Sequence, residues 1–353
     1  MSILEKVGLK LLHRFDPERA HSLSIQALRL GVAPLHGGSV TSPRLKIEVG
    51  GISMPNPIGL AAGYDKNAQA LKPLSKAGFG FLEVGAATPR PQEGNKKPRL
   101  YRLNEDRGVI NRFGFNNQGI EPIKKRLKRV PTDIPRGLNL GANKDSHQQS
   151  DDFGYVLSKA SAWIDFATVN VSSPNTKNLR DLQGKAALED LLNRVDEANK
   201  KQERRVPIFL KIAPDLNETE IQDIADIALD VGLSAIICTN TTVDRKNLFS
   251  KHKNQSGGLS GRPLFEKSTR ILAQMRIATK GQIDLIGVGG VSSAEDVYTK
   301  IQAGASAVQL YSALIYEGLS LIPRIANGLD KILISEGIDR LDTAVGVSTE
   351  KWL

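Results

Sequence analysis

Eight short apolar runs recur along the chain, and most are separated by stretches with helical periodicity. The runs are 57–63, 79–85, 135–141, 165–171, 207–212, 235–240, 283–288 and 307–311. Continuous apolar runs of this length are typical of parallel strands buried on both faces. Helical patterns lie between them, for example at 186–203, 218–231, 267–279 and 294–302. This alternation predicts an α/β fold, a (β/α)8 or TIM barrel, over about residues 45–335.

A doubly wound parallel sheet is the alternative architecture for the same alternation of strands and helices. Such sheets carry a Gly-x-Gly-x-x-Gly turn after the first strand when they bind a dinucleotide. No such turn follows the run at 57–63. The barrel is therefore the favoured prediction.

The first 40 residues follow a different pattern, that of two short amphipathic helices. One apolar face consists of Ile3, Leu4, Val7, Leu11, Leu12 and Phe15, and a second of Ala20, Leu23, Ala27, Leu28 and Leu30. Asp16-Pro17-Glu18 is a helix start signal between them. We predict a helical extension over 1–40 that packs on the barrel or meets a bilayer surface with its apolar face. Residues 336–353 form a tail with no assigned role.

Composition narrows the possible functions only a little. The chain has 353 residues and a formal net charge of +10, which permits nucleic acid, an anionic membrane or anionic small molecules as partners. The basic stretch 121–130 suits any of these, or simply a solvated helix face. The single cysteine, Cys238, excludes a disulfide framework and cysteine-rich metal sites, and no metal is expected. No apolar run reaches the ~18 residues of a membrane span, so we expect no crossing.

The chemistry is concentrated where the predicted strands end. These ends carry Asn139, Asn170, Asn175, Lys66, Lys211, Thr239, Asn240 and Thr241, but no histidine and no pair of carboxylates. Amide side chains both donate and accept hydrogen bonds, so this set suits a flat, neutral-to-anionic ligand with many polar edges. It does not suit glycoside hydrolysis by two carboxylates or a three-histidine zinc site.

A phosphate site is predicted at the ends of strands seven and eight. Gly289-Gly290 follows the seventh run and Tyr311-Ser312 the eighth, and the loops at these places commonly bind phosphate in such barrels. Flavin mononucleotide (FMN) and pyridoxal phosphate both fit this prediction. The second of these would use Lys66 or Lys211 as a Schiff base.

Several long motifs together resemble the dihydroorotate dehydrogenase family. They are 88–99, 111–117, 170–176, 211–215, 239–242, 257–263, 287–290 and 309–312, and the resemblance covers about residues 1–330 in order. Two features resemble the quinone-linked, membrane-associated class in particular. These are the N-terminal helical pair and Ser173, at a position where the cytosolic class usually has cysteine.

The resemblance implies a role for each matching position. FMN would be held by Ala61, Ala62, Gly63, Tyr64, Asp65, Ala86, Asn139, Asn170, Lys211 and Thr239, and its phosphate end by Gly261, Gly290, Tyr311 and Ser312. Dihydroorotate would be held by Lys66, Asn111, Arg112, Phe113, Gly114, Phe115, Asn170, Asn175, Asn240 and Thr241. Ser173 would be the catalytic base, beneath a polar segment at 172–184, and His21 and Arg102 would lie near the quinone head group. One departure is Ala86, where the family often has threonine, so backbone or water would replace a hydroxyl contact to the flavin.

The implied activity is oxidation of (S)-dihydroorotate to orotate in pyrimidine biosynthesis, with FMN as hydride acceptor and a membrane quinone as final acceptor. The implied protein is a monomer attached peripherally to the cytoplasmic face of the cell membrane, without nucleic acid. The alternatives are a cytosolic-type dihydroorotate dehydrogenase, a flavin barrel similar to the tRNA-dihydrouridine synthases, and a binding module that uses 121–130.

Overall fold

The structure is a closed barrel of eight parallel strands, and this computed structural model describes residues 2–175 and 179–353. The barrel strands are β3 (Ile58–Leu60), β4 (Phe81–Ala87), β7 (Arg136–Leu140), β8 (Phe166–Asn170), β9 (Ile208–Ile212), β10 (Ala235–Cys238), β12 (Asp284–Val288) and β13 (Ala307–Leu310). Each strand pairs in parallel with the next along the chain, and β13 pairs with β3 to close the barrel. All eight predicted runs are strands, so the barrel is confirmed and an open doubly wound sheet is excluded.

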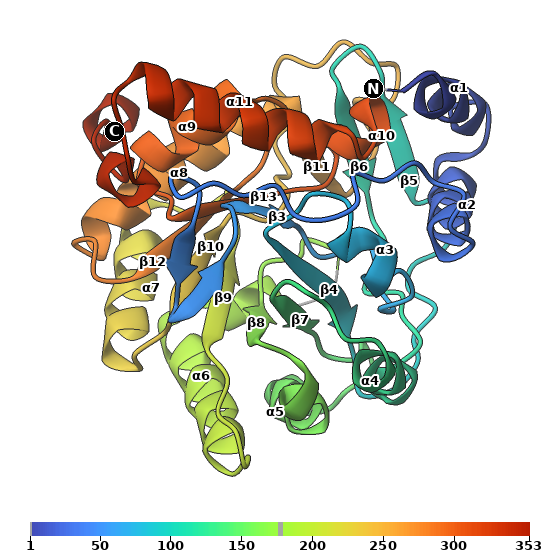
Figure 1. The fold of residues 1–353 in the computed structure, drawn as a ribbon. Coiled ribbons are helices and arrows are strands. Elements are labelled where there is room, and N and C mark those ends of the chain that lie inside the picture. The colour runs from blue at the N-terminus through green and yellow to red at the C-terminus, as the bar shows by residue number, and fades with distance from the viewer. Residues whose placement is uncertain (1, 176–178) are drawn as a thin grey trace.

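Helices surround the barrel, as Figure 1 shows. They are α3 (Leu71–Ser75), α4 (Ile120–Arg129), α5 (Gln149–Ala160), α6 (Lys185–Lys200), α7 (Glu218–Asp230), α8 (Phe265–Ala278), α9 (Ala294–Gln302), α10 (Ala313–Glu317) and α11 (Leu321–Ser335). Local signals explain where several begin. Asn217 and Glu220 form a capping box at the start of α7, and the Ser293 side chain caps α9.

Three phenylalanine rings fill the barrel near the beginnings of its strands. Phe166 stacks on Phe209 with ring centroids 4.6 Å apart, and Phe81 lies edge-on to Phe166 at 6.2 Å. Glycines make room for these rings, because a Cβ atom at Gly59 would overlap Phe81 and one at Gly137 would overlap Phe166. This end of the barrel is closed, so any ligand site must lie at the other end.

A methyl group added at Gly137 is therefore expected to destabilise the barrel. Gly137→Ala forces the Phe166 ring out of its place, and overpacking of a core costs about 1–3 kcal/mol. Urea unfolding followed by circular dichroism measures this loss. Gly8→Ala is the matched control, because nothing lies within 4 Å of that position and alanine favours a helix. An unchanged unfolding midpoint for Gly137→Ala would contradict this account of the core.

Five further strands were not expected from the sequence. β1 (Ile47–Val49) and β2 (Ile52–Met54) form a hairpin. β5 (Leu100–Leu103), β6 (Gly108–Asn111) and β11 (Gly258–Gly261) form an antiparallel sheet in which β6 lies in the middle. β11 comes from a loop of the barrel far along the chain, so no local pattern reveals its pairing. Figure 1 shows this small sheet standing above the barrel, beside α10.

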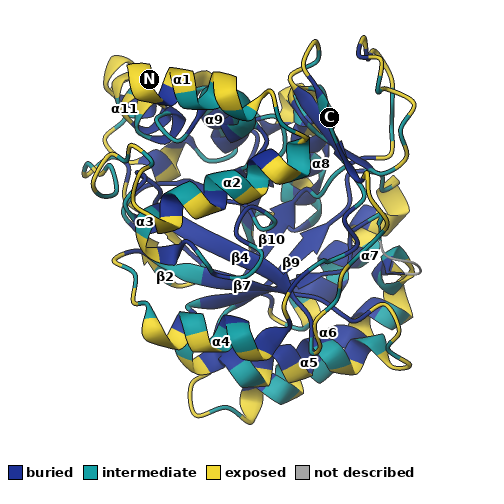
Figure 2. Ribbon diagram, turned by 90° about the vertical axis from the view of Figure 1, so that its right-hand side faces the viewer, coloured by how far each residue is buried: buried dark blue, intermediate teal, exposed yellow. Residues whose placement is uncertain are grey.

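The two predicted N-terminal helices are confirmed as α1 (Ile3–Leu12) and α2 (Pro17–Arg29). The Asp16 carboxylate caps α2 by accepting hydrogen bonds from the backbone of Glu18 and Arg19. α2 buries Ile25 and Leu28, whereas α1 leaves an apolar face open to solvent (Figure 2). That face consists of Ile3, Leu4, Val7 and Leu11, which are 55–81% exposed. Among the described helices, none combines the length and apolarity needed to span a membrane.

The C-terminal residues 336–353 pack against the barrel instead of extending from it. They form two short 3-10 turns, Leu341–Ala344 and Thr349–Trp352, in which Leu341 and Ala344 are buried. The Trp352 ring lies edge-on to Phe265 at the start of α8, 6.2 Å away. The tail therefore covers the outer surface of the barrel near α8.

Candidate active site

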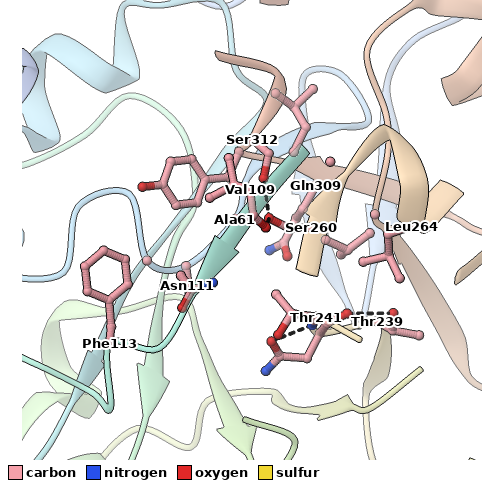
Figure 3. Close-up of a pocket in the computed structure, with 18 of the residues that line it drawn as sticks. Ala61, Val109, Asn111, Phe113, Thr239, Thr241, Ser260, Leu264, Gln309 and Ser312 are labelled. Atoms are coloured by element: carbon pink, nitrogen blue, oxygen red, sulfur yellow. Dashed lines mark hydrogen bonds between the residues drawn. The ribbon is translucent and has the colours of Figure 1, made fainter. Parts of the chain in front are cut away.

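A cavity opens at the end of the barrel where the strands finish, under the small antiparallel sheet (Figure 3). Most residues selected from the sequence line it together. They are Ala61, Ala62, Gly63, Lys66, Ala86, Asn111, Phe113, Gly114, Phe115, Asn139, Asn170, Ser173, Asn175, Lys211, Thr239, Asn240, Thr241, Gly261, Gly290, Tyr311 and Ser312. These residues come from all eight barrel strands or their loops and from the added sheet.

Three of the residues assigned to the cofactor and the substrate do not line this cavity. The Asp65 carboxylate accepts hydrogen bonds from the backbone of Gln69 and Ala70, at 2.8 and 2.7 Å, and so holds the turn that carries Lys66. Tyr64 lies behind the cavity wall, edge-on to Tyr311 at 5.4 Å. Arg112 also points elsewhere, because its guanidinium donates to the Tyr101 hydroxyl, the Pro98 carbonyl and the Ser256 carbonyl. The structure thus gives these side chains supporting positions.

A continuous chain of side-chain hydrogen bonds crosses the floor of the cavity. The Asn240 side-chain amide donates to Asn170 Oδ1 at 3.2 Å, and the Asn170 side-chain amide donates to Asn139 Oδ1 at 2.9 Å. Asn139 donates to one oxygen of the Glu83 carboxylate at 2.6 Å, and Gln309 donates to the other at 2.5 Å. Each amide therefore has a defined orientation, and the polar edges that face a ligand are set before it binds.

Glu83 and Gln309 were not selected from the sequence. Both are fully buried. Each is a polar residue within an apolar run, and that contrast is the sequence signal that could have identified them. The Lys211 ammonium is also buried. Burial lowers the pKa of Lys211, and the negative charge of Glu83 opposes that shift. Glu83 is thus the buried countercharge of Lys211.

Ser173 lies in the segment that follows β8, and it is 7% exposed. Its Oγ accepts a hydrogen bond from the Asn175 backbone at 3.3 Å. The Arg180 guanidinium ties the segment to the cavity rim by donating to the Ser172 and Thr241 carbonyls. The polar segment expected to cover Ser173 includes 176–178, which lie outside the described residues.

Lys66 supplies the second ammonium group at the cavity, and its side chain is partly buried. Its Nζ lies 4.0 Å from the centre of the Phe113 ring, an arrangement that stabilises a cation. Burial lowers the pKa of Lys66 to about 8, with Arg99 adding to this effect and Glu18 opposing it. Near neutral pH the group is therefore a cation at the cavity wall.

Three buried side-chain oxygens on residues that line this cavity have no hydrogen-bond partner in the described protein. They are Asn116 Oδ1, Thr241 Oγ1 and Gln309 Oε1, on residues that all line the cavity. Buried polar atoms in folded proteins are nearly always bonded. These oxygens therefore fit a bound molecule with several N–H or O–H groups, such as a flavin together with a dihydropyrimidine.

The end of the cavity that was expected to bind phosphate has features that the sequence did not reveal. Gly289 and Gly290 both have positive φ angles, 118° and 77°, which glycine adopts readily. Ser260 of β11 shares a hydrogen bond of 2.8 Å with Ser312 (Figure 3). Arg107 and Arg262 also line the cavity. Their role was missed because the β6–β11 pairing brings them there from distant parts of the chain.

The two residues expected near a quinone head group lie on the α2 side of the molecule, outside the cavity lining. His21 Nδ1 is 3.3 Å from the Tyr311 hydroxyl, and the His21 ring meets Tyr64 edge-on at 5.4 Å. Burial, aided by the Lys66 charge, lowers the pKa of His21 to about 3, so its ring is neutral. Arg102 donates to the carbonyls of Leu12, His13 and Phe15, between α1 and α2.

Comparison with known proteins gives a consistent result. The family described as "Dihydroorotate dehydrogenase" matches residues 44–333. A protein of Cereibacter sphaeroides named dihydroorotate dehydrogenase (quinone) is 58% identical over 354 residues, covering 100% of both chains. One of Agrobacterium fabrum with the same name is 45% identical and covers 99% of this chain and 98% of its own.

Solved structures agree with the sequence comparison. The ligand-free dihydroorotate dehydrogenase of Eimeria tenella is 39% identical, with a TM-score of 0.91, over 94% of this chain and 99% of that one. The enzyme of the same organism in complex with ferulenol is 38% identical, with a TM-score of 0.90, over 94% of this chain and 95% of that one. Fold, sequence and cavity residues thus agree, and this chain belongs to the dihydroorotate dehydrogenase family, together with relatives named as its quinone-dependent enzymes.

Proposed function

We propose that the protein oxidises (S)-dihydroorotate to orotate, with FMN as the bound hydride acceptor and a membrane quinone as the final electron acceptor. This reaction would serve pyrimidine biosynthesis. The observation that carries the proposal is one cavity in which Ser173, Lys66 and Lys211 surround the ordered amide chain. Cys238 is buried and absent from the cavity lining, which disfavours a flavin barrel that needs a cysteine acid.

The residues present fit FMN. Asn139, Asn170, Lys211 and Thr239 would hold the ring system, and Gly261, Gly290 and Ser312 would hold the phosphate end. FMN supplies the hydride acceptor that no side chain can provide. The buried Lys211 ammonium would place a positive charge next to the bound flavin ring and so stabilise negative charge on it.

Dihydroorotate would lie between the flavin ring and the Ser173 loop. Lys66 carries the positive charge for its carboxylate, and Asn111, Asn175 and Asn240 offer donors and acceptors to its amide edges. Ser173 would accept the proton from C5 while hydride leaves C6. A serine hydroxyl is a weak base, so its burial and a proton relay to water must assist it.

A lipid-soluble acceptor would reach the barrel by way of the N-terminal helices. The open apolar face of α1 suits the surface of a bilayer, in which an amphipathic helix lies with its apolar side inward. His21 and Arg102 would lie near the quinone head group. The open α1 face supports peripheral attachment to a membrane. We propose in addition that the protein is a monomer at the cytoplasmic face of the cell membrane and does not bind nucleic acid.

A spectroscopic titration tests the proposed function directly. The purified protein is expected to show flavin absorbance near 450 nm, which anaerobic dihydroorotate bleaches and a soluble quinone restores. Fumarate and NAD are the comparison acceptors. Absence of flavin, absence of bleaching, or equally fast recovery with fumarate or NAD would each overturn the corresponding part of the proposal.

The Lys66 charge predicts how substrate binding depends on pH. Its pKa is about 8, so the ammonium is lost as pH rises through 8 while the substrate carboxylate stays ionised. KM for dihydroorotate should therefore rise above pH 8, by up to about tenfold per pH unit. Lys66→Met should raise KM about 10- to 100-fold at pH 7 and remove the pH dependence. The exposed Lys72→Met is the control, and a flat KM profile in the unmodified protein would refute the assignment.

A further inference from the structure

A further buried lysine, Lys300 of α9, lies behind the cavity wall and outside the proposed machinery. Its side chain is fully buried. The ammonium donates to Ser268 Oγ and Thr269 Oγ1, both at 2.9 Å, and lies 4.9 Å from the centre of the Phe265 ring. Among the described ion pairs, none includes Lys300. A charge is thus held in the interior by two hydroxyl groups and an aromatic face.

The groups that hold Lys300 also hold the glycine turn expected to bind phosphate. Ser268 Oγ lies 3.2 Å from the Gly289 carbonyl oxygen and 3.1 Å from the Phe265 carbonyl oxygen, and it shares its one proton between these two acceptors. A Cβ atom at Gly289 would come within 2.6 Å of that hydroxyl, and one at Gly290 within 2.5 Å of Phe265 Cβ. The turn is therefore pressed onto the first residues of α8, and Lys300 lies directly beneath them.

A buried ammonium without a carboxylate partner costs free energy, because it has lost its hydration without gaining a countercharge. Burial lowers the pKa of Lys300 to about 7, and Cys238 and Asp296 oppose this shift only in part. An anion bound on the other side of the Gly289–Gly290 turn would supply the missing countercharge. Electrostatic interactions through the protein interior are screened by solvent and salt much less than those at a surface.

We propose that Lys300 is a positioning residue for the phosphate end of the bound cofactor. It would stabilise the phosphate dianion through the protein interior and, by way of Ser268, hold the Gly289 carbonyl away from that anion. The inference rests on the proposed use of FMN, and it concerns cofactor affinity and not the chemical step. The phosphate group alone should sense this charge, since the ring system of the cofactor lies toward the barrel centre.

Comparison of FMN with riboflavin, which lacks the phosphate, tests this inference. The full-length chain is freed of flavin and titrated with each compound by fluorescence quenching. Lys300→Met is expected to weaken FMN binding at least tenfold and to leave riboflavin affinity within about twofold of the unmodified protein. Lys331→Met, an exposed lysine of α11, should change neither value.

Two results for Lys300→Met would overturn the inference. One is an equal loss of affinity for FMN and riboflavin, which indicates that the lysine has only a structural role. The other is an unchanged affinity for FMN. Failure of the unmodified chain to bind either compound would instead overturn the proposed function, and this inference with it. Ser268→Ala covers the case in which Lys300→Met does not fold. That variant keeps the Lys300 side chain but removes one of its two hydroxyl partners and the link to Gly289, so FMN affinity should fall about threefold and riboflavin affinity should not. Equal FMN affinity in Ser268→Ala would count against the inference.

Discussion

Replacing Ser173 by alanine is expected to lower the rate of dihydroorotate oxidation by about 100- to 10,000-fold, the usual contribution of a positioned general base. The flavin should stay bound, because the amide chain from Asn240 to Glu83 does not include Ser173. Anaerobic stopped-flow measurement of flavin bleaching gives the rate, and the absorbance spectrum before mixing gives the bound flavin.

Two further variants sharpen the test of Ser173. Ser173→Cys introduces the residue that the cytosolic class usually has, and it should recover part of the rate, more so at high pH, where the thiol ionises. Ser158→Ala, on the exposed side of α5, should leave the rate unchanged. Full activity in Ser173→Ala would show that another group removes the proton.

Replacing Lys211 by methionine is expected to slow flavin reduction about 100- to 1,000-fold, as for loss of one preorganised group facing developing charge. Lys211 is buried beside the hydrogen-bonded Glu83 carboxylate, so its charge acts in a site from which water is excluded. The rate is read from the same bleaching experiment at saturating dihydroorotate. Lys201→Met, an exposed lysine after α6, is the matched control.

Loss of Lys211 also leaves the Glu83 carboxylate buried without its countercharge, which is itself destabilising. The double variant Lys211→Met with Glu83→Gln removes both charges and separates the two effects. We expect it to recover stability in urea unfolding but not the rate of bleaching. Recovery of the rate would mean that Lys211 acts on stability and not on the reaction.

The barrel could be predicted because its strands are buried on both faces. Runs such as 165–171 and 235–240 are therefore mainly apolar, and that pattern is visible without any knowledge of their partners. The capped start of α2 at Asp16 was visible for a similar reason, since a helix cap depends on neighbours within three residues. Most cavity residues could then be predicted as well, because a closed parallel barrel places the carboxyl ends of all its strands at the same end.

Pairing between distant segments could not be predicted in this way. β11 joins β6 only in the folded chain, and this pairing brings Ser260 and Arg262 to the end of the cavity for which we propose phosphate binding. Glu83 and Gln309 were overlooked inside apolar runs, although a carboxylate in a buried strand indicates a partner. Conversely, Tyr64, Asp65 and Arg112 were assigned to the site by the resemblance, yet their side chains lie outside the cavity lining.

The sequence by itself determined the barrel, the two N-terminal helices and the set of polar residues at the strand ends. Each of these depends on burial or capping, which act within a few residues and leave a periodic trace. The tertiary structure alone decided which of those polar groups are in contact, how the side-chain amides are oriented, and which lysine side chains are shielded from solvent. These properties depend on hydrogen bonds and on solvent exclusion between segments far apart in the chain. The apolar runs thus indicated where the site lies, and tertiary packing determined which of its ionisable groups are buried and how their pKa values shift.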